Sequence, residues 1–213
     1  MYKKIVLKKG KEESLLRLHP WVFSGAILKM DETLEEGELV KVYTHGGNFI
    51  GVGHFQIGSI TVRILSFHDV PIDADFWQSR LKAAVAVREA IGVIRPEESV
   101  AATGETVNTT YRLVHGEGDN LPGLIVDVYG TTCVMQAHSV GMHVARYEIA
   151  DALRAVLGEK IDSIYYKSET TLPFKADLGQ ENGFLYGDTD NNIAIENGLK
   201  FHIDWLKGQK TGF

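Results

Sequence analysis

The sequence has 213 residues, of which 44% are hydrophobic and 23% are charged, and its formal net charge is −6. This composition is typical of a globular protein and excludes collagen-like, disordered and disulfide-framework classes. The one cysteine, Cys133, has no partner for an internal disulfide, and no apolar run approaches the roughly 18 residues of a membrane span. We therefore expect a cytoplasmic protein with no membrane partner.

Charge is distributed unevenly along the chain. Residues 1–30 carry a net charge of +5, and the remaining residues carry −11. A basic end on an acidic protein can bind anions without causing aggregation, although a solvated lysine face has the same composition. The basic residues of this end are Lys3, Lys4, Lys8, Lys9, Lys11, Arg17 and Lys29.

Residues 1–70 predict a small β domain. Apolar residues alternate with polar ones in short runs, and glycines separate these runs at hairpin spacing. A short helix is expected at 12–18, because Pro20 disfavours helical backbone at the residue before it. Strands this short are typical of a small closed or half-closed β-barrel. The expected strands are 2–9, 38–44, 48–56 and 59–67.

Residues 71–192 predict a domain of mixed strands around helices, so the fold class is α+β. Asp75 fits the N-cap of a helix that runs to about Ile91, and a second amphipathic helix fits 142–157. The apolar face of the first helix comprises Trp77, Leu81, Ala84, Val85 and Ile91. The expected strands are 111–115, 124–129, 131–138 and 161–167.

Residues 193–203 predict a β-hairpin, which opens the last segment, 193–213. A two-residue turn would put the isoleucines of its first strand on the face opposite the apolar residues of its second strand. A three-residue loop pairs Ile195 with Leu199 and gathers the apolar residues on one face, and we favour it for that reason. Such a hairpin needs a partner surface, so either it folds back on the second domain or its partner has been removed. An uncovered hairpin would promote association into a homodimer.

The glycine-rich segment 116–123 follows a strand but does not have the spacing of a dinucleotide-binding loop, and a strand follows it. A turn in which Asp119 accepts nearby backbone N–H groups is the simpler interpretation. His115, Glu117 and Asp119 also offer the histidine base and carboxylate pair of a small hydrolase. A structural alternative is that Arg112 pairs with a carboxylate of the turn.

No metal site is predicted. Segment 188–192 begins like a calcium loop but has no glycine at its sixth position, and the histidines lack the spacing of zinc ligands. Cys133 lies in an alternating strand with no basic neighbour that would lower its pKa. We therefore expect a buried structural thiol rather than a nucleophile.

Segment 17–25 (RLHPWVFSG) places two large aromatic residues beside the basic end of the chain. Aromatic side chains can stack on unpaired bases while lysine and arginine bind phosphates, which is the usual combination in RNA recognition. The alternative is that Trp21, Phe23 or both close the small barrel.

Three ordered motifs carry a family resemblance over essentially the whole chain: 15–27 (LLRLHPWVFSGAI), 111–127 (YRLVHGEGDNLPGLIVD), and 196–201 (ENGLKF) together with 208–213 (GQKTGF). The sequence resembles the S-adenosylmethionine-dependent cytosine-5 methyltransferases of large-subunit ribosomal RNA. The resemblance implies a PUA RNA-binding domain at 1–70, a central α+β domain at 71–192, and a lead-in at 193–213 to an absent Rossmann-like methyltransferase domain.

This resemblance implies that the chain recognises ribosomal RNA but does not catalyse methyl transfer by itself, so no catalytic residues are assigned. S-adenosylmethionine would bind only in the longer enzyme, where Gln209 and Lys210 would lie at the mouth of its pocket. An autonomous RNA-binding or adaptor protein is the first alternative, and the hydrolase built on His115, Glu117 and Asp119 is the second. The expected RNA-binding residues are Lys3, Lys4, Lys8, Lys9, Arg17, His19, Trp21 and Arg63.

Overall fold

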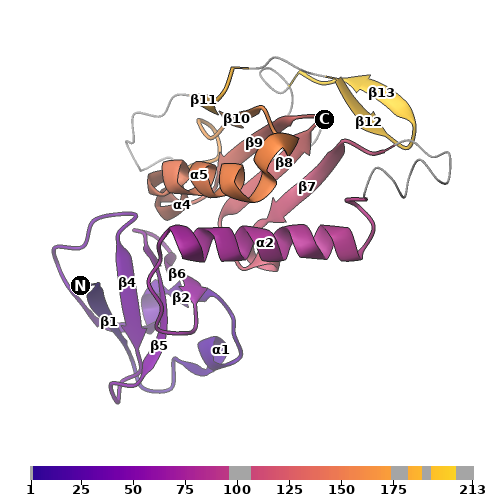
Figure 1. The fold of residues 1–213 in the computed structure, drawn as a ribbon. Helices are drawn as coiled ribbons and strands as arrows, with labels where there is room; N and C mark the ends of the chain where they lie inside the picture. The colour runs from indigo at the N-terminus through magenta and orange to yellow at the C-terminus, as the bar shows by residue number, and fades with distance from the viewer. Residues whose placement is uncertain (1, 96–106, 174–181, 189–192, 205–213) are drawn as a thin grey trace.

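The computed structural model describes residues 2–95, 107–173, 182–188 and 193–204. This part of the chain forms a six-stranded sheet, a five-stranded sheet and a two-stranded hairpin. Figure 1 shows the first sheet as one unit in indigo and purple, and the second sheet with its helices as another unit. The predicted α+β class is confirmed, with a small β domain, a mixed domain and a terminal hairpin. The domain boundaries at residues 70 and 192 stay predictions.

The first sheet has the strand order β2-β6-β5-β4-β1-β3, and its members are β1 (Lys3–Leu7), β2 (Trp21–Phe23), β3 (Ile27–Met30), β4 (Leu39–Tyr43), β5 (Phe49–Phe55) and β6 (Ile60–Ser66). A single helical turn, α1 (Glu13–Leu16), precedes β2. The four predicted strands and the short helix are confirmed. Strands β2 and β3 were not predicted, because three or four residues are too few to show an alternation.

Alternation within these strands builds the core of the first unit. In β1, Ile5 and Leu7 are fully buried, whereas Lys4, which precedes them, is exposed. Strand β1 lies between β4, which runs parallel to it, and β3, which runs antiparallel. The remaining core residues are Leu15, Val22, Val40, Val42, Ile50, Phe55, Val62 and Ile64.

The second sheet has the order β11-β10-β9-β8-β7, with β7 (Thr110–His115), β8 (Leu124–Tyr129), β9 (Thr132–Ala137), β10 (Ser163–Tyr166) and β11 (Gly183–Tyr186). Strands β9 and β10 are parallel, and the other neighbours are antiparallel. The four predicted strands are confirmed. Strand β11 was missed because it is short and only partly buried.

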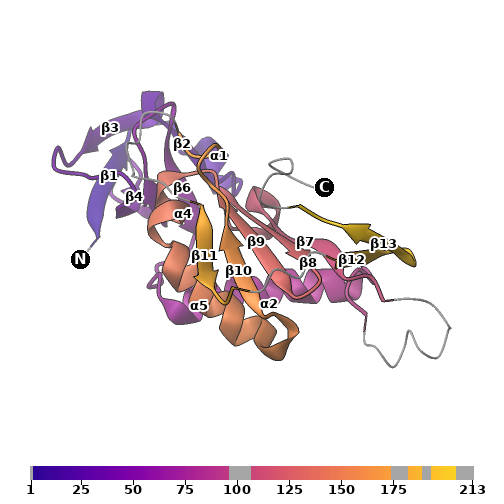
Figure 2. The same ribbon diagram turned by 90° about the horizontal axis from the view of Figure 1, so that it is seen from above.

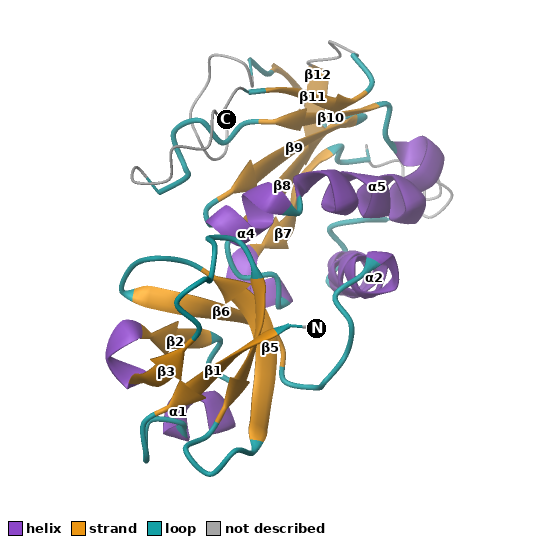
Figure 3. Cartoon of the chain, turned by 90° about the vertical axis from the view of Figure 1, so that its left-hand side faces the viewer, coloured by secondary structure: helices purple, strands orange, loops and turns teal. Residues whose placement is uncertain are grey.

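Helices α2 (Ala74–Ala90) and α5 (Arg146–Leu157) cover one face of this sheet, with α4 (Val140–Val144) before α5 (Figures 2 and 3). The predicted N-cap is wrong: Asp73, rather than Asp75, accepts the hydrogen bond of the capping position, from Phe76 N–H. Ile91 is also not on the buried face, because the helix ends before it and its side chain is 67% exposed.

The single helix predicted at 142–157 is instead two helices that meet at Ala145. The first, α4, begins two residues earlier, at Val140, because the Ser139 side chain caps it at Met142 N–H. This break lets α4 turn toward the first unit while α5 follows the sheet. Four residues of the predicted stripe are buried as expected, namely Ala145, Ile149, Ala152 and Leu153.

The hairpin of β12 (Ile193–Glu196) and β13 (Leu199–His202) has the two-residue turn, so the favoured three-residue loop is wrong. Asn197 and Gly198 both have positive φ, 51° and 80°, and Glu196 faces Leu199. This conformation is the usual two-residue hairpin turn, which suits asparagine followed by glycine.

The hairpin folds back on the second sheet. Ala194 and Ile203 are buried against Tyr129, Val134 and Tyr165, on the sheet face opposite the helices. On its other face Ile193 is 52% exposed among the described residues. The covered face thus needs no second copy of the chain, and the homodimer stays a prediction.

The two units share a buried contact surface. His54 of β5 stacks on Trp77 of α2, with ring centroids 6.2 Å apart, and lies against Gly141 of α4. The Gln56 side-chain oxygen accepts the Val140 N–H at 3.2 Å. These contacts fix the orientation of the barrel-like unit relative to the second sheet.

Candidate nucleic-acid interface

Several cations of the basic end follow the first strand and the first helix of the chain. Lys8 and Lys9 directly follow β1, and Arg17 directly follows α1, and all three residues are exposed. The Lys8 ammonium donates to the Gly25 carbonyl oxygen at 3.0 Å, which ties the end of β1 to the segment after β2. Figures 2 and 3 show α1 and β2 at this end of the unit.

The two aromatic side chains of β2 point outward. Val22 between them is 1% exposed and fills the core, whereas Trp21 is half-buried and Phe23 is 47% exposed. The alternative that one of them closes the barrel is therefore wrong, because β2 turns its odd-numbered residues to the surface. His19, Trp21 and Phe23 form an edge-to-face series with ring centroids 5.4 and 6.3 Å apart.

A hollow of about 330 Å³ lies beside these rings. Trp21 and Phe23 line one side, and Lys11 and Ser14 line the other. An unpaired base has the flat apolar face that stacks on such rings, and the neighbouring cations can bind its phosphates. The hollow therefore combines the chemical groups that single-stranded RNA requires.

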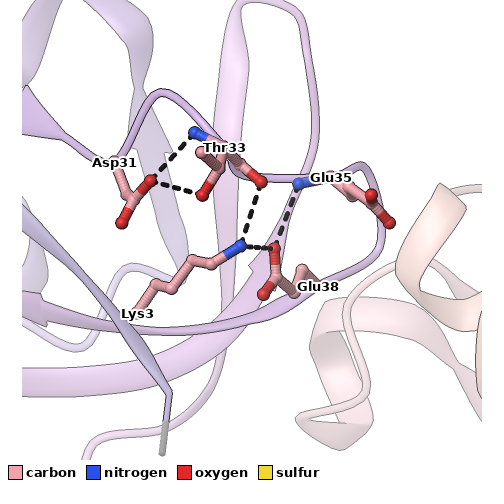
Figure 4. Close-up of polar contacts among 5 residues, drawn as sticks. All are labelled: Lys3, Asp31, Thr33, Glu35 and Glu38. Atoms are coloured by element: carbon pink, nitrogen blue, oxygen red, sulfur yellow. Dashed lines mark hydrogen bonds and ion pairs between the residues drawn. The ribbon is translucent and has the colours of Figure 1, made fainter.

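Lys3 has a different environment from the other lysines (Figure 4). Its ammonium donates to the Glu38 carboxylate and to the Thr33 carbonyl oxygen, both at 2.9 Å. The Glu35 N–H and the Lys3 ammonium together lower the pKa of the Glu38 carboxyl. Lys3 thus holds the loop between β3 and β4, and its charge is offset within the protein.

Asp31 closes the same loop by accepting hydrogen bonds from the Thr33 hydroxyl and the Thr33 N–H, at 2.6 and 2.9 Å, and these bonds lower its pKa. Lys4, in contrast, is exposed, and its ammonium lies 5.2 Å from the centre of the Tyr43 ring. Of the two lysines at the start of β1, Lys4 is the one available to an external anion.

Arg63 lies directly opposite Trp21 in the register of β2 and β6. Its guanidinium donates to the Gln56 side-chain oxygen at 3.2 Å. Partial burial lowers the pKa of Arg63, and the nearby Glu117 carboxylate opposes that effect. The structure therefore brings Arg63, Trp21 and His19 together, at the edge of the first unit that faces the second.

The three residues of the predicted hydrolase are engaged in structural contacts. Asp119 forms an ion pair with the buried Arg88 of α2 and accepts the His115 backbone N–H. Glu117 accepts a hydrogen bond from the Trp21 indole N–H at 2.8 Å. Because both carboxylates bind other groups and the contact of Asp119 with His115 is to the backbone, this arrangement holds the turn 116–123 and gives the hydrolase no support.

Arg112 does not pair with a carboxylate of that turn, contrary to the structural alternative. It pairs with Asp127, directly opposite on β8, with distances of 2.8 and 3.0 Å. The turn is held instead by Arg88, for which the sequence analysis predicted no role. Arg88 donates to Asp119 and to the Arg112 carbonyl oxygen, so one buried side chain joins α2, β7 and the turn.

Cys133 is a structural residue, as predicted. It is fully buried in β9 on the helix side of the sheet, and burial raises the pKa of its thiol to about 12. Within the described residues, no group of three or more His, Cys, Asp or Glu side chains is placed to hold a metal ion. None of the helices described is both long and apolar enough to cross a membrane.

Several predicted residues lie outside the described part of the chain. Gln209 and Lys210, expected beside the cofactor, are among them, as is most of segment 188–192. The glycine-rich turn 116–123 leads into β8 rather than into a helix, so it is not a dinucleotide-binding loop, as predicted.

Sequence reasoning missed two residues of the interface. Glu117 was considered only as a catalytic carboxylate, and Gln56 was not considered. Both make their contacts across the boundary between the units, and the Glu117 contact joins residues 96 positions apart. A single sequence contains no periodic signal for such a pair.

Comparison with known proteins agrees with this fold. Residues 5–67 match the model of the PUA-like domain family. Ribosomal RNA large subunit methyltransferase I of Vibrio cholerae is 35% identical over 212 residues, which are 98% of this chain and 50% of that relative. The protein of the same name from Aeromonas hydrophila is 36% identical, with 98% and 51% covered. The chain thus spans about half the length of the curated relatives it matches.

Solved structures show the same fold. A proposed SAM-dependent methyltransferase from Streptococcus mutans superposes with a TM-score of 0.71 at 18% identity, over 94% of this chain and 48% of the other. A proposed methyltransferase complexed with SAH gives 0.70 at 19% identity, over 94% and 47%. The first sheet is therefore a PUA-like domain. Nearly the whole chain is similar to a segment that makes up about half the length of each ribosomal RNA large subunit methyltransferase I.

Proposed function

We propose that this chain is the RNA-recognising part of a cytoplasmic, S-adenosylmethionine-dependent ribosomal RNA (cytosine-5) methyltransferase. The observation that carries the proposal is the outer face of the PUA-like domain, where Trp21 and Phe23 border a hollow that Lys11 also lines. Lys8 donates to the Gly25 carbonyl oxygen in the lining of this hollow, and Lys9 and Arg17 are exposed. The names of the relatives agree with a ribosomal RNA substrate.

RNA binding on this face would divide into two parts. The exposed cations would neutralise backbone phosphates, which supplies most of the affinity and makes it fall with added salt. The exposed faces of the β2 rings would stack on unpaired bases, which favours single-stranded segments over a regular duplex. Lys3 would contribute least, because Glu38 already offsets its charge.

The second unit would act as a rigid support that places the bound RNA. Its contacts with the PUA-like domain are buried at His54 and Gln56, so the two units hold one orientation. A base that is methylated at C5 must leave its stack to react, and a fixed orientation limits where it can emerge.

Methyl transfer would require groups that the described residues lack. Methylation at C5 of cytosine needs a thiolate that attacks C6. Cys133 is the sole cysteine of the sequence, and burial keeps its thiol protonated and out of reach of a base. S-adenosylmethionine supplies the methyl group in the relatives' reaction class, and this chain would contribute RNA binding rather than the reacting groups.

The test is filter binding of a ribosomal RNA segment at about 50 and 200 mM salt. The variant Lys8→Ala/Lys9→Ala/Arg17→Ala should bind more than ten-fold more weakly at low salt, and the slope of log affinity against log salt should fall by about 2. Lys82→Ala/Lys160→Ala/Lys200→Ala is the matched control, because it removes three exposed charges from the rest of the molecule. Equal affinity of wild type and the first variant would refute the proposed face.

A further inference from the structure

One carboxylate of the second unit lies on the proposed RNA face. Glu117, in the turn after β7, is exposed, and its Oε1 atom lies 2.8 Å from the indole nitrogen of Trp21. Arg63 is the cross-strand neighbour of Trp21, and the charge of Glu117 acts on its guanidinium. A single anionic group thus faces both an aromatic hydrogen-bond donor and a cation.

This contact is not what holds the two units together. The joint between them has its own buried contacts, where the His54 ring lies against Gly141 and stacks on Trp77, and where Gln56 accepts the Val140 N–H. The bond between Trp21 and Glu117 lies at the exposed rim of the joint. An exposed hydrogen bond of this kind can exchange for another partner at small cost, since water or a ligand replaces it.

The groups around Glu117 are those that an RNA phosphate would use. An indole N–H donates to any anionic oxygen, and a guanidinium pairs with phosphate as readily as with carboxylate. We propose that Glu117 occupies, in the RNA-free protein, the position of an RNA phosphate, and that bound RNA displaces its carboxylate from Trp21 and Arg63. This inference rests on the proposed RNA-binding function.

Displacement of this kind makes the face selective among polyanions. A polyanion that contacts only Lys8, Lys9 and Arg17 meets the repulsion of Glu117 and binds weakly. An RNA that also stacks on Phe23 and fills the hollow makes enough contacts to move the carboxylate aside. Glu117 is thus a positioning residue that raises the threshold for binding, rather than a group that reacts.

The decisive variant is Glu117→Gln, which keeps an oxygen that accepts the Trp21 N–H but removes the charge. Its RNA affinity at low salt should be about five-fold higher than that of the wild type, because one close like-charge repulsion is lost. The gain should shrink as salt rises. Glu159→Gln, which changes an exposed carboxylate in the turn after α5, is the matched control and should leave the affinity unchanged.

The indole N–H resonance of Trp21, assigned by its loss in Trp21→Phe, reports the contact without an activity assay. It should move in Glu117→Ala without RNA, and move again when RNA binds the wild type. If the wild type binds RNA but Glu117→Gln binds it equally or more weakly, the displacement is wrong while the RNA-binding function stands. If the wild type binds no RNA at either salt concentration, the proposed function itself fails and the displacement fails with it.

Discussion

Replacing Gly141 with alanine should destabilise the protein, although helix propensity alone predicts the opposite. Gly141 lies inside α4, where alanine is normally favoured over glycine by about 1 kcal/mol. A Cβ atom built at this position would lie 2.1 Å from Cγ and 2.3 Å from Cβ of His54. These atoms are at the base of the His54 side chain, so they cannot move away unless β5 moves with them.

The size of the effect follows from two opposing free energies, the gain in helix propensity and the cost of overpacking. Overpacking a buried site costs about 1–3 kcal/mol, and the His54 ring has little room to shift because it stacks on Trp77. The overlap with two atoms at the base of the His54 side chain puts the cost in the upper part of this range, about 2–3 kcal/mol. After the gain of about 1 kcal/mol in helix propensity, we expect a net loss of about 1–2 kcal/mol in the free energy of unfolding. For a chain of this size, that loss lowers Tm by about 4 °C.

Thermal and urea unfolding followed by circular dichroism would measure this loss. Gly183→Ala is the matched control, because an added Cβ at that position meets open space. In the double variant Gly141→Ala/His54→Gly both overlapping atoms of residue 54 are removed, so its loss should be at least 1 kcal/mol smaller than the sum of the two single losses. A Gly141→Ala protein as stable as the wild type, or strict additivity in the double variant, would refute the tight joint between the units.

Two further predictions concern buried charge. Burial lowers the pKa of His54 from 6.5 to about 4, so the unfolded chain binds a proton that the folded protein does not. The free energy of unfolding therefore has its full value above pH 6.5, and it falls by about 1.4 kcal/mol per pH unit between pH 6.5 and 4. Urea titrations at pH 7, 6 and 5 should show this slope in the wild type and a shallower one in His54→Asn, and parallel slopes would contradict the assignment. Arg88→Leu removes the partner of Asp119 and should cost about 3–5 kcal/mol at pH 7, because it leaves a buried carboxylate unpaired. A urea midpoint that implies a loss below about 1 kcal/mol would contradict that role, and Lys82→Ala on the exposed face of α2 should leave the midpoint unchanged.

Sequence patterns predicted the elements that have a clear period or a clear stop. Strands β4 to β9 were found because their apolar residues alternate or run together between glycines. Helix α2 was found from its apolar stripe, but its cap was placed two residues late. Asp73 and Asp75 are both suitable N-cap residues, and only the backbone bond to Phe76 distinguishes them.

The wrong predictions concern features that are set by contacts between residues distant in sequence. The turn of the hairpin was misassigned because its apolar residues can be gathered on one face by a longer loop, whereas the true register is set by the surface of Tyr129, Val134 and Tyr165. The break at Ala145 likewise depends on where the first unit lies. No local pattern contains that information.

The candidate site was predicted only in part. The basic residues and the aromatic pair follow from composition in one short segment, and in the structure Lys8, Lys9 and Arg17 are exposed at the ends of β1 and α1. The neutralised Lys3 and the bond from Trp21 to Glu117 could not be predicted. Both depend on partners that are at least 30 residues away.

The position of β1 limits how the protein can be shortened. Residues 3–7 form a strand with neighbours on both sides, parallel to β4 and antiparallel to β3. Deleting them would separate β3 from the sheet and expose the apolar side of β4 to water. Truncations that reach Ile5 should therefore yield insoluble protein. Expression libraries for this domain need to keep the first seven residues intact.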